Sequence, residues 1–510
     1  MPFSAGSDQS RLLTLTSLLL EEKVSPQGDG RGVGCGATVM RKKLQNPRQR
    51  RLRRQSLSRC DISKEAILPC GKLTHRFAVH IRRNDMIIYT VKNGDSLFKI
   101  AQQFGTTVEE LERLNNLGNI RYLPEGLSLI VPSESGSYRV RRGDSLYSIA
   151  LSNGLTVEEL LGLNPTLKPP FTIYPNQILL VPKAAKRRTI DVNGYCYSYI
   201  KTENLNAALP YLTYLSIFSY NIMPDGSLRG INDDRIITAA RAQNVAPLMV
   251  VANLNEDEAF DSELAKRFLR NDVAQRNFIN GIPAYLKGKG YMGINLDFEY
   301  VYAENREDYN VFMCNLAERL SKEGLILTTA LAPKSSDNQS GILFEGHDYR
   351  RLGECCDWIM LMTYDWGYAA GPPQAVSPLN EVEKVVRYAT KVIPSQKLLL
   401  GLPNYAYDWT LPYRSGTRAK YLKLNEVPQY AADRGAVIKF DSTAATPYFN
   451  YRDNSGREHV VWYDDARSWT EKLKLVEEYN LLGVGIWTVD NPFIPGLEAI
   501  ADMYDIRKLL

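Results

Sequence analysis

Gly293-Ile294-Asn295-Leu296-Asp297-Phe298-Glu299-Tyr300 is a short apolar stretch that also carries one carboxamide and two carboxyl groups. Successive side chains of a β-strand point to opposite faces, so Asn295, Asp297 and Glu299 would share one face. Apolar residues fill the other face and both flanks, which favours a fully buried strand over an edge strand with a solvated polar face. Two carboxyl groups held side by side in such a strand repel each other as anions, so one keeps its proton at a raised pKa. The stretch therefore predicts a general acid.

Similar apolar segments occur on both sides of this stretch, and amphipathic segments such as 310–323 and 380–392 lie between most of them. Including the stretch itself, the predicted strands are 190–197, 212–220, 246–251, 293–300, 325–331, 358–364, 397–403 and 483–489. Eight strands that alternate with helices predict an α/β fold, the (β/α)8 TIM barrel, over residues 189–510. Chemistry in such barrels lies at the C-terminal ends of the strands, and Glu299 would end the fourth.

One connection is too long for a simple barrel loop. It lies between the seventh strand and its helix and contains strand-like pieces at 436–440 and 459–463. Long loops without secondary structure are improbable in a compact domain. We therefore expect a small α+β insertion at about 408–464 that walls one side of the cleft.

An internal repeat precedes the barrel. Residues 89–97, Tyr-Thr-Val-Lys-Asn-Gly-Asp-Ser-Leu, return at 138–146 as Tyr-Arg-Val-Arg-Arg-Gly-Asp-Ser-Leu. Each copy reads strand, helix, helix, strand, with Asp95 and Asp144 placed to cap the first helix and Thr107 and Thr156 the second. The copies, at 86–133 and 137–183, resemble LysM modules, which bind glycans rich in N-acetylglucosamine such as peptidoglycan and chitin.

The LysM resemblance implies a glycan-binding groove beside the loop after each first strand. The residues concerned are Gly94, Asp95, Ser96, Leu97, Gly143, Asp144, Ser145 and Leu146. The same residues may serve only to cap helices, and both interpretations stay open. Two linked modules on a repetitive polymer would gain avidity through effective concentration.

The N-terminal segment 1–85 differs in composition from the rest. Residues 41–59 are dense in Arg, Lys, Gln and Ser, which bury too little apolar surface to fold. We expect this segment to be disordered or non-native, with Met86 as the true start, and the alternative is a basic targeting arm. No apolar run of transmembrane length and no clear secretion signal occur, so we expect no membrane partner and a protein made in the cytoplasm.

Charge and cysteine content exclude several classes of function. The net charge of +5 is small for 510 residues, so nucleic acid is not an expected partner. The seven cysteines are scattered without a Cys-x-x-Cys pair, which suggests neither a disulfide framework nor a zinc site. We expect reduced thiols, no metal and no other cofactor.

The fourth strand resembles the signature of glycoside hydrolase family 18, Asp-x-x-Asp-x-Asp-x-Glu. The corresponding residues here are Met292, Asn295, Asp297 and Glu299, so two of the four depart from the pattern. The resemblance implies that Glu299 is the general acid/base and that Asp297 orients the acetamido group of the substrate. Asn295 leaves a hydrogen-bonding group beside Asp297 and removes a buried charge, so we expect Asp297 to ionise more easily than beside a carboxylate.

Further landmarks of the family occur at other strand ends. Met362-Thr363-Tyr364-Asp365 resembles its Met-x-Tyr-Asp motif, which implies that Tyr364 bonds the acetamido oxygen and Asp365 a sugar hydroxyl. Trp487 resembles the tryptophan that floors the subsite before the scissile bond. Tyr195, Tyr405 and Trp366 are further candidates for the lining of the cleft. The implied mechanism is substrate-assisted and retaining, with the 2-acetamido group of the sugar as nucleophile.

The combination of a LysM pair with this barrel, over 86–510, resembles the spore cortex-lytic N-acetylglucosaminidases. We therefore predict a monomeric hydrolase that cleaves N-acetylglucosamine linkages in spore cortex or cell-wall peptidoglycan and is deposited in the spore coat or cortex layers. Two alternatives remain at this point, a chitinase acting on environmental chitin and a catalytically inactive glycan-binding protein.

Overall fold

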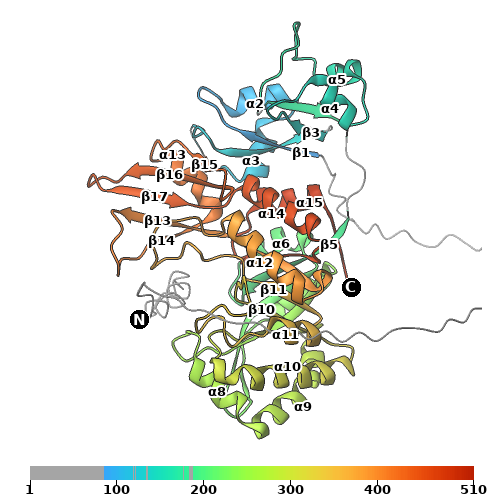
Figure 1. Ribbon diagram of the computed structural model, residues 1–510, viewed down its shortest axis with the longest axis vertical. Coiled ribbons are helices and arrows are strands. Elements are labelled where there is room, and N and C mark those ends of the chain that lie inside the picture. The colour runs from blue at the N-terminus through green and yellow to red at the C-terminus, as the bar shows by residue number, and fades with distance from the viewer. Residues whose placement is uncertain (1–84, 119, 121, 134–135, 176, 183–187) are drawn as a thin grey trace, which may run out of the picture. The chain divides into compact units, whose positions relative to one another are not determined.

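The computed structural model describes residues 85–118, 120, 122–133, 136–175, 177–182 and 188–510 (Figure 1). Asp85 already belongs to the first strand, and the expectation of disorder for the preceding segment lies outside the described residues.

A closed barrel of parallel strands forms the largest sheet of the described chain. Its strands are β5 (Thr189–Tyr197), β6 (Tyr214–Ile222), β8 (Ala246–Ala252), β9 (Gly293–Asp297), β10 (Ile326–Leu331), β11 (Trp358–Leu361), β12 (Leu398–Pro403) and β18 (Gly483–Trp487). Each pairs in parallel with the next, and β18 pairs with β5 to close the ring. The predicted (β/α)8 barrel is confirmed, with β9 as the fourth strand.

Helices follow the strands and cover the outside of the barrel. They are α6 (Thr202–Ala208), α7 (Asp234–Ala242), α8 (Ser262–Leu269), α9 (Asp272–Lys289), α10 (Arg306–Ser321), α11 (Tyr349–Cys355), α12 (Leu379–Val392), α14 (Ala466–Glu478) and α15 (Ile494–Met503). Among the described residues, none of the helices is both long and apolar enough to span a membrane.

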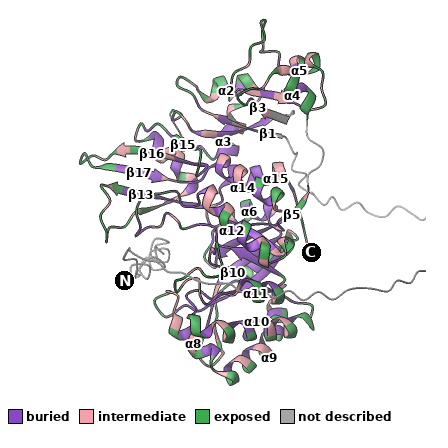
Figure 2. Ribbon diagram, in the orientation of Figure 1, coloured by how far each residue is buried: buried purple, intermediate pink, exposed green. Residues whose placement is uncertain are grey.

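The barrel strands are largely buried (Figure 2). Alternation along them separates two buried clusters. Ile294, Leu296 and Phe298 of the fourth-strand segment pack outward with the helices. Tyr195 and Tyr364 belong instead to the cluster that fills the barrel interior. This separation follows from the period of two in a strand, and it directs Asn295 and Asp297 inward.

Two strands that carry predicted site residues end earlier than expected. β9 ends at Asp297 and β11 at Leu361, so Glu299 and Tyr364 lie just beyond the sheet ladder. The chain turns sharply after both residues, since Tyr300 has a φ of 55° and Asp365 a φ of 64°. A left-handed residue cannot continue a strand, so neither strand can extend beyond Glu299 or Tyr364.

The long connection after β12 forms a subdomain with its own antiparallel sheet. Its elements are β13 (Tyr405–Leu411), β14 (Lys420–Lys423), α13 (Val427–Ala432), β15 (Lys439–Asp441), β16 (Thr446–Arg452) and β17 (Glu458–Trp462), with strand order β14-β13-β17-β16-β15. The α+β character agrees with the sequence expectation, but the first strand begins at Tyr405, directly after the barrel strand.

Both repeats have the expected order of elements. The first contains β1 (Asp85–Thr90), α2 (Leu97–Phe104), α3 (Val108–Asn115) and β2 (Ser128–Ser133). The second contains β3 (Gly136–Arg139), α4 (Leu146–Ser152), α5 (Val157–Leu163) and β4 (Ile178–Val181).

Capping of the repeat helices differs from the prediction in one respect. Thr107 and Thr156 cap α3 and α5 as expected. Ser96 and Ser145, rather than the aspartates before them, cap α2 and α4. The carboxylate of Asp95 instead accepts hydrogen bonds from the Tyr89 hydroxyl and the Lys92 N–H, both at 2.7 Å, which closes the preceding turn.

The first repeat contacts the barrel domain directly. The backbone N–H of Ile438 donates to the Glu125 carbonyl at 2.8 Å, and the Arg467 guanidinium donates to the Gly126 carbonyl at 3.1 Å. Ile130 of β2 also packs with Ala466 and Ala499 of helices α14 and α15. The first repeat is therefore joined to the barrel by packing as well as by the chain.

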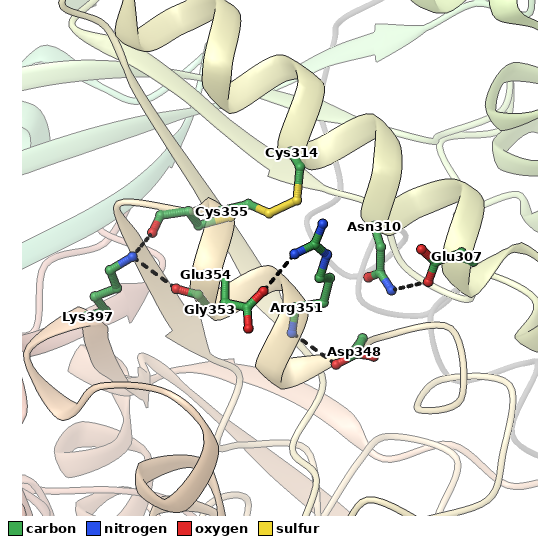
Figure 3. Close-up of a disulfide and its surroundings, with 10 residues drawn as sticks. Glu307, Asn310, Cys314, Asp348, Arg351, Gly353, Glu354, Cys355 and Lys397 are labelled. Atoms are coloured by element: carbon green, nitrogen blue, oxygen red, sulfur yellow. Dashed lines mark hydrogen bonds and ion pairs between the residues drawn. A yellow bond between two sulfur atoms is a disulfide. The ribbon is translucent and has the colours of Figure 1, made fainter.

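Cys314 of α10 and Cys355 of α11 form a disulfide, so the expectation of reduced thiols is wrong for this pair (Figure 3). The two residues are 41 positions apart in sequence, but the packing of α10 against α11 brings their Cα atoms to 5.0 Å. That distance suits a disulfide. Tertiary packing creates this proximity, and no local sequence pattern predicts it. Cys196 and Cys356 are free and buried.

Candidate active site

Asn295 lies inside the barrel on β9, fully buried. Its Oδ1 accepts a hydrogen bond from the Tyr195 hydroxyl at 3.0 Å, and its Nδ2 donates to Thr328 Oγ1 at 2.8 Å. Both polar ends of the carboxamide are thus occupied by neighbours on β5 and β10. The orientation of Asn295 is set by these two contacts.

Asp297 ends β9 and is 2% exposed. Among the residues that the structure describes, its Oδ1 has no hydrogen-bond partner. The expectation that Asn295 would bond to it is therefore wrong, because Tyr195 and Thr328 hold the amide. Burial raises the pKa of Asp297 to about 7. An unpaired buried carboxyl is costly, and it suits a site that bonds to an incoming ligand.

Glu299 follows two residues later and remains partly open to solvent. Desolvation, together with the nearby carboxyl groups of Asp297 and Asp365, raises its pKa well above the usual value. A carboxyl group that keeps its proton near neutral pH can act as a general acid. This agrees with the prediction of a protonated carboxyl in the stretch.

The segment after β11 adds an acid and a phenol, and β13 adds a second phenol. The Tyr405 hydroxyl donates to Asp365 Oδ1 at 2.6 Å, and the rings of Tyr364 and Tyr405 meet edge to face at 6.4 Å between centroids. Asp365 remains accessible, but desolvation by the protein around it raises its pKa to about 6. Burial, together with the neighbouring carboxyl groups of Asp297 and Asp365, raises the pKa of Tyr364 far above its usual value. Tyr364 therefore remains a neutral hydrogen-bond donor.

Aromatic rings surround the end of β18. Trp487 is partly exposed, and its ring lies 5.4 Å from Tyr195 and 5.1 Å from Phe218 between centroids. Met362 belongs to the same interior cluster. Trp366 packs instead with the cluster between strands and helices. The predicted residues other than Trp366 therefore gather at one end of the barrel.

Backbone strain marks the same place. Tyr300 and Asp365 directly follow Glu299 and Tyr364, and both adopt the left-handed conformation. Such a residue costs on the order of 1–3 kcal/mol unless it is glycine, and strain of this kind persists where surrounding contacts impose it. Its occurrence beside two candidate site residues points to a site selected for geometry. The arrangement can donate a proton from Glu299 and accept a hydrogen bond at Asp297.

Residues 191–491 match the profile of the glycosyl hydrolases family 18. The chain is a family 18 glycoside hydrolase. Its residues 89–132 and 138–182 match the LysM domain.

Similar proteins align with most of the length of this family 18 hydrolase. The cortical fragment-lytic enzyme of Bacillus subtilis is 39% identical over 430 residues, which cover 83% of this chain and 99% of that protein. The enzyme of the same description from Bacillus anthracis is 37% identical over 428 residues, 82% of this chain and 99% of that protein. The crystal structure of the Bacillus cereus spore cortex-lytic enzyme SleL superposes with a TM-score of 0.75 and 34% identity, covering 83% and 99% of the two chains.

The predicted LysM residues of the family 18 hydrolase lie in two equivalent exposed loops. Gly94 and Gly143 have φ values of 82° and 93°, which favour glycine. Ser96 and Ser145 are exposed, whereas Asp95, Asp144, Leu97 and Leu146 are partly covered. Sequence reasoning missed the aromatic residue after each leucine: Phe98 is 69% exposed and Tyr147 is 68% exposed. Their recurrence at the repeat offset of 49 was the available signal.

Three further residues near the cleft of the hydrolase escaped prediction. Asn253 and His347 bond to the backbone around Glu299. Asp490 accepts a hydrogen bond from the Tyr197 N–H at 3.1 Å, and burial raises its pKa to about 7. Asp490 follows Trp487 by three residues, so its place at a strand end was a readable signal. Asn253 and His347 carry no comparable signal, because their partners are backbone atoms.

Proposed function

We propose that this protein is a peptidoglycan-binding N-acetylglucosaminidase that acts on spore cortex by a retaining, substrate-assisted mechanism. The observation that carries this proposal is the pair of carboxyl groups where β9 ends: among the described residues Asp297 Oδ1 has no hydrogen-bond partner, and burial with the neighbouring carboxyl groups raises the pKa of Glu299. Glu299 would supply the proton, and Asp297 would receive a hydrogen bond that no described residue provides.

In the proposed mechanism, Glu299 protonates the glycosidic oxygen while the 2-acetamido carbonyl of the substrate attacks the anomeric carbon. Asp297 accepts the amide N–H and makes that carbonyl more nucleophilic. Tyr364, neutral at all working pH values, donates to the acetamido oxygen. The ionised Glu299 then takes a proton from water, which opens the oxazolinium ion with net retention.

Other residues would hold the sugar around this centre. The indole face of Trp487 offers an apolar platform for pyranose C–H groups and leaves the hydroxyls free. Asp365 would bond a sugar hydroxyl, with Tyr405 fixing its orientation through the 2.6 Å hydrogen bond. Met362 and Tyr195 would complete the walls, with Tyr195 acting through Asn295.

The choice of cortex as substrate rests on similarity along nearly the whole chain. Relatives from Bacillus subtilis and Bacillus anthracis are described as cortical fragment-lytic enzymes, and both alignments include the LysM region. We infer that the LysM modules bind peptidoglycan through the loops around Ser96 and Ser145. We also infer that the protein acts as a monomer, is made in the cytoplasm and is deposited in the spore layers.

Replacement of Glu299 by Gln tests the proposed acid. Glu299→Gln keeps the size and hydrogen-bonding capacity of the side chain but cannot donate the proton, so we expect kcat to fall by at least about 10²-fold. Release of new reducing termini from cortex fragments measures turnover, and sedimentation with insoluble peptidoglycan measures binding. Binding should be unchanged. Glu318→Gln, in an exposed ion pair with Lys322, is the control and should keep full activity. Full turnover of Glu299→Gln would refute the proposal.

Mass spectrometry of the products decides between substrates. Cortex peptidoglycan and chitin are digested side by side at equal enzyme concentration. Fragments that end in reducing N-acetylglucosamine, released faster from cortex, would support the proposal. Faster release of chitin oligosaccharides would favour the chitinase alternative.

A further inference from the structure

Glu299 lies where the regular support of the sheet has stopped. β9 ends at Asp297, so the backbone of residues 298–300 lacks the strand pairing that holds Asn295 and Leu296 in register. Tyr300 then adopts its left-handed conformation. A backbone in that position needs other partners, because buried N–H and C=O groups are rarely left unpaired.

Asn253, from the segment after β8, contacts the backbone of Glu299 on both sides. Its Oδ1 accepts the Glu299 N–H at 2.9 Å, and its Nδ2 donates to the Glu299 carbonyl at 3.0 Å. The same Nδ2 donates to the Asp261 carbonyl at 3.0 Å, and the Asp261 N–H donates to the Asn253 carbonyl at 2.8 Å. The side chain is fully buried. It therefore ties Glu299 to two points of the neighbouring loop.

Two further side chains hold the residues on either side of Glu299. His347 Nε2 lies 2.8 Å from the Phe298 carbonyl, and Ser262 Oγ donates to the Tyr300 carbonyl at 2.6 Å. His347 is itself held by Lys334, whose ammonium donates to the His347 carbonyl at 3.1 Å. Burial lowers the pKa of His347 to about 4, so the imidazole is neutral and its Nε2–H is the donor. Its position is tightly defined, since a Cβ on Gly346 would come within 2.1 Å of the Val301 carbonyl oxygen.

We propose that Asn253, Ser262 and His347 are positioning residues that hold the backbone of residues 298–300 and thereby place the Glu299 carboxyl for proton transfer. Asn253 and Ser262 lie at the two ends of the connection from β8 to α8, and His347 lies in the connection from β10 to α11. The three side chains contact consecutive carbonyls. None of them needs to touch substrate. A carboxyl group displaced by about 1 Å can lose about 10²-fold in rate, so a small shift of this backbone has a large effect on catalysis.

The proposal rests on the proposed role of Glu299, and kinetics on soluble cortex fragments tests it in the full-length protein. Asn253→Ala should lower kcat by about 10- to 100-fold while KM changes less than about threefold. His347→Phe keeps the ring and removes the donor, so it should lower kcat as well. His347→Gln restores an N–H near the same position and should recover much of the loss. Ser262→Ala should have a smaller effect, and Ser262→Thr should restore it.

Asn164→Ala is the matched control. Asn164 of the second repeat also clamps backbone in both directions, donating to the Leu160 and Leu180 carbonyls at 2.7 and 2.8 Å and accepting the Leu180 N–H at 2.7 Å. It lies far from Glu299 in sequence and belongs to another module. We expect it to lose thermal stability with kcat unchanged. Melting temperatures measured in parallel allow every rate to be expressed per folded molecule.

The outcomes separate the two proposals. If Glu299→Gln is inactive, Asn253→Ala has a low kcat and His347→Gln recovers activity, the positioning role is supported. If Glu299→Gln is inactive but Asn253→Ala and His347→Phe keep a normal kcat per folded molecule, the positioning role alone is overturned. Active Glu299→Gln overturns the acid and the positioning role together. If Asn253→Ala does not fold, the His347 and Ser262 pairs decide the same question.

Discussion

At the residue scale, the neutral side chain of Asn295 determines how much charge lies beside Asp297. Its two hydrogen bonds point to Tyr195 and Thr328, so it neither pairs with Asp297 nor adds a charge to it. In the proposed mechanism, Asp297 must be ionised to accept the substrate amide, and Glu299 must be protonated. Activity should therefore rise as pH increases through about 7, where Asp297 ionises, and fall at higher pH as Glu299 loses its proton.

Asn295→Asp tests this account of pH dependence. A carboxyl group beside Asp297 disfavours its ionised form, so the pKa of Asp297 rises and the acid limb of kcat/KM moves to higher pH, by on the order of one unit. The measurement is a pH profile of kcat/KM on soluble fragments for the two proteins. Asn164→Ala is a control that should leave the profile unchanged. An acid limb that stays in place or moves to lower pH would contradict the account.

Sequence patterns identified residues that point into the barrel and failed for those that act through backbone. Asp297 and Glu299 could be found because a period of two and a strand end are visible in the chain, whereas Tyr364 was found through the resemblance of its motif to that of family 18. The bonds of Asn295 could not, because the choice between Asp297, Tyr195 and Thr328 depends on how three strands meet. Asn253 and His347 lie 46 and 48 residues from Glu299 and contact only its main-chain neighbourhood, so residue type gave no indication.

At the element scale, the apolar runs placed all eight barrel strands, but the predicted ends of three of them, β9, β11 and β18, were extended too far. Apolar runs show where a strand is buried, but the chain stays buried after the hydrogen-bonded pairing of the strand has stopped. The left-handed turns at Tyr300 and Asp365 keep two strands from continuing, and tyrosine rarely adopts that conformation. Which helices pack against each other could not be predicted from the sequence either, and the disulfide between α10 and α11 is the clearest case.

The disulfide gives a prediction about these two helices. A cross-link between residues 41 apart removes chain entropy from the unfolded state and should stabilise the fold by about 4 kcal/mol. Cys314→Ser, or reduction of the native protein, should lower the free energy of unfolding by up to that amount. Urea unfolding with and without reductant measures it. The double variant Cys314→Ser/Cys355→Ser should not respond to reductant, and a native protein that carries both thiols free would contradict the prediction.

At the scale of the whole molecule, the LysM pair and the barrel divide the work of binding and cleavage. The first repeat is not a loosely tethered module, because Arg467 and Ile438 bond to its Gly126 and Glu125 carbonyls. Ile130 also covers Ala466 and Ala499. Deletion of the repeats would expose this surface and perturb the barrel. Point changes on the exposed side of the modules therefore separate anchoring from catalysis more cleanly than a truncation.

Phe98 and Tyr147 are the residues for that experiment, since they occupy equivalent exposed positions in α2 and α4. Phe98→Ser and Tyr147→Ser should each weaken sedimentation with insoluble peptidoglycan, and the double variant should weaken it more than the two single losses predict. Avidity explains the difference, because linked modules exceed either affinity alone by about 10²–10⁴-fold. Cleavage of soluble fragments should be unchanged in all three. Val273→Ser, which removes a 57% exposed apolar side chain from α9, should sediment normally. If one single variant abolishes sedimentation and the other has no effect, only one module engages the polymer and the avidity argument fails.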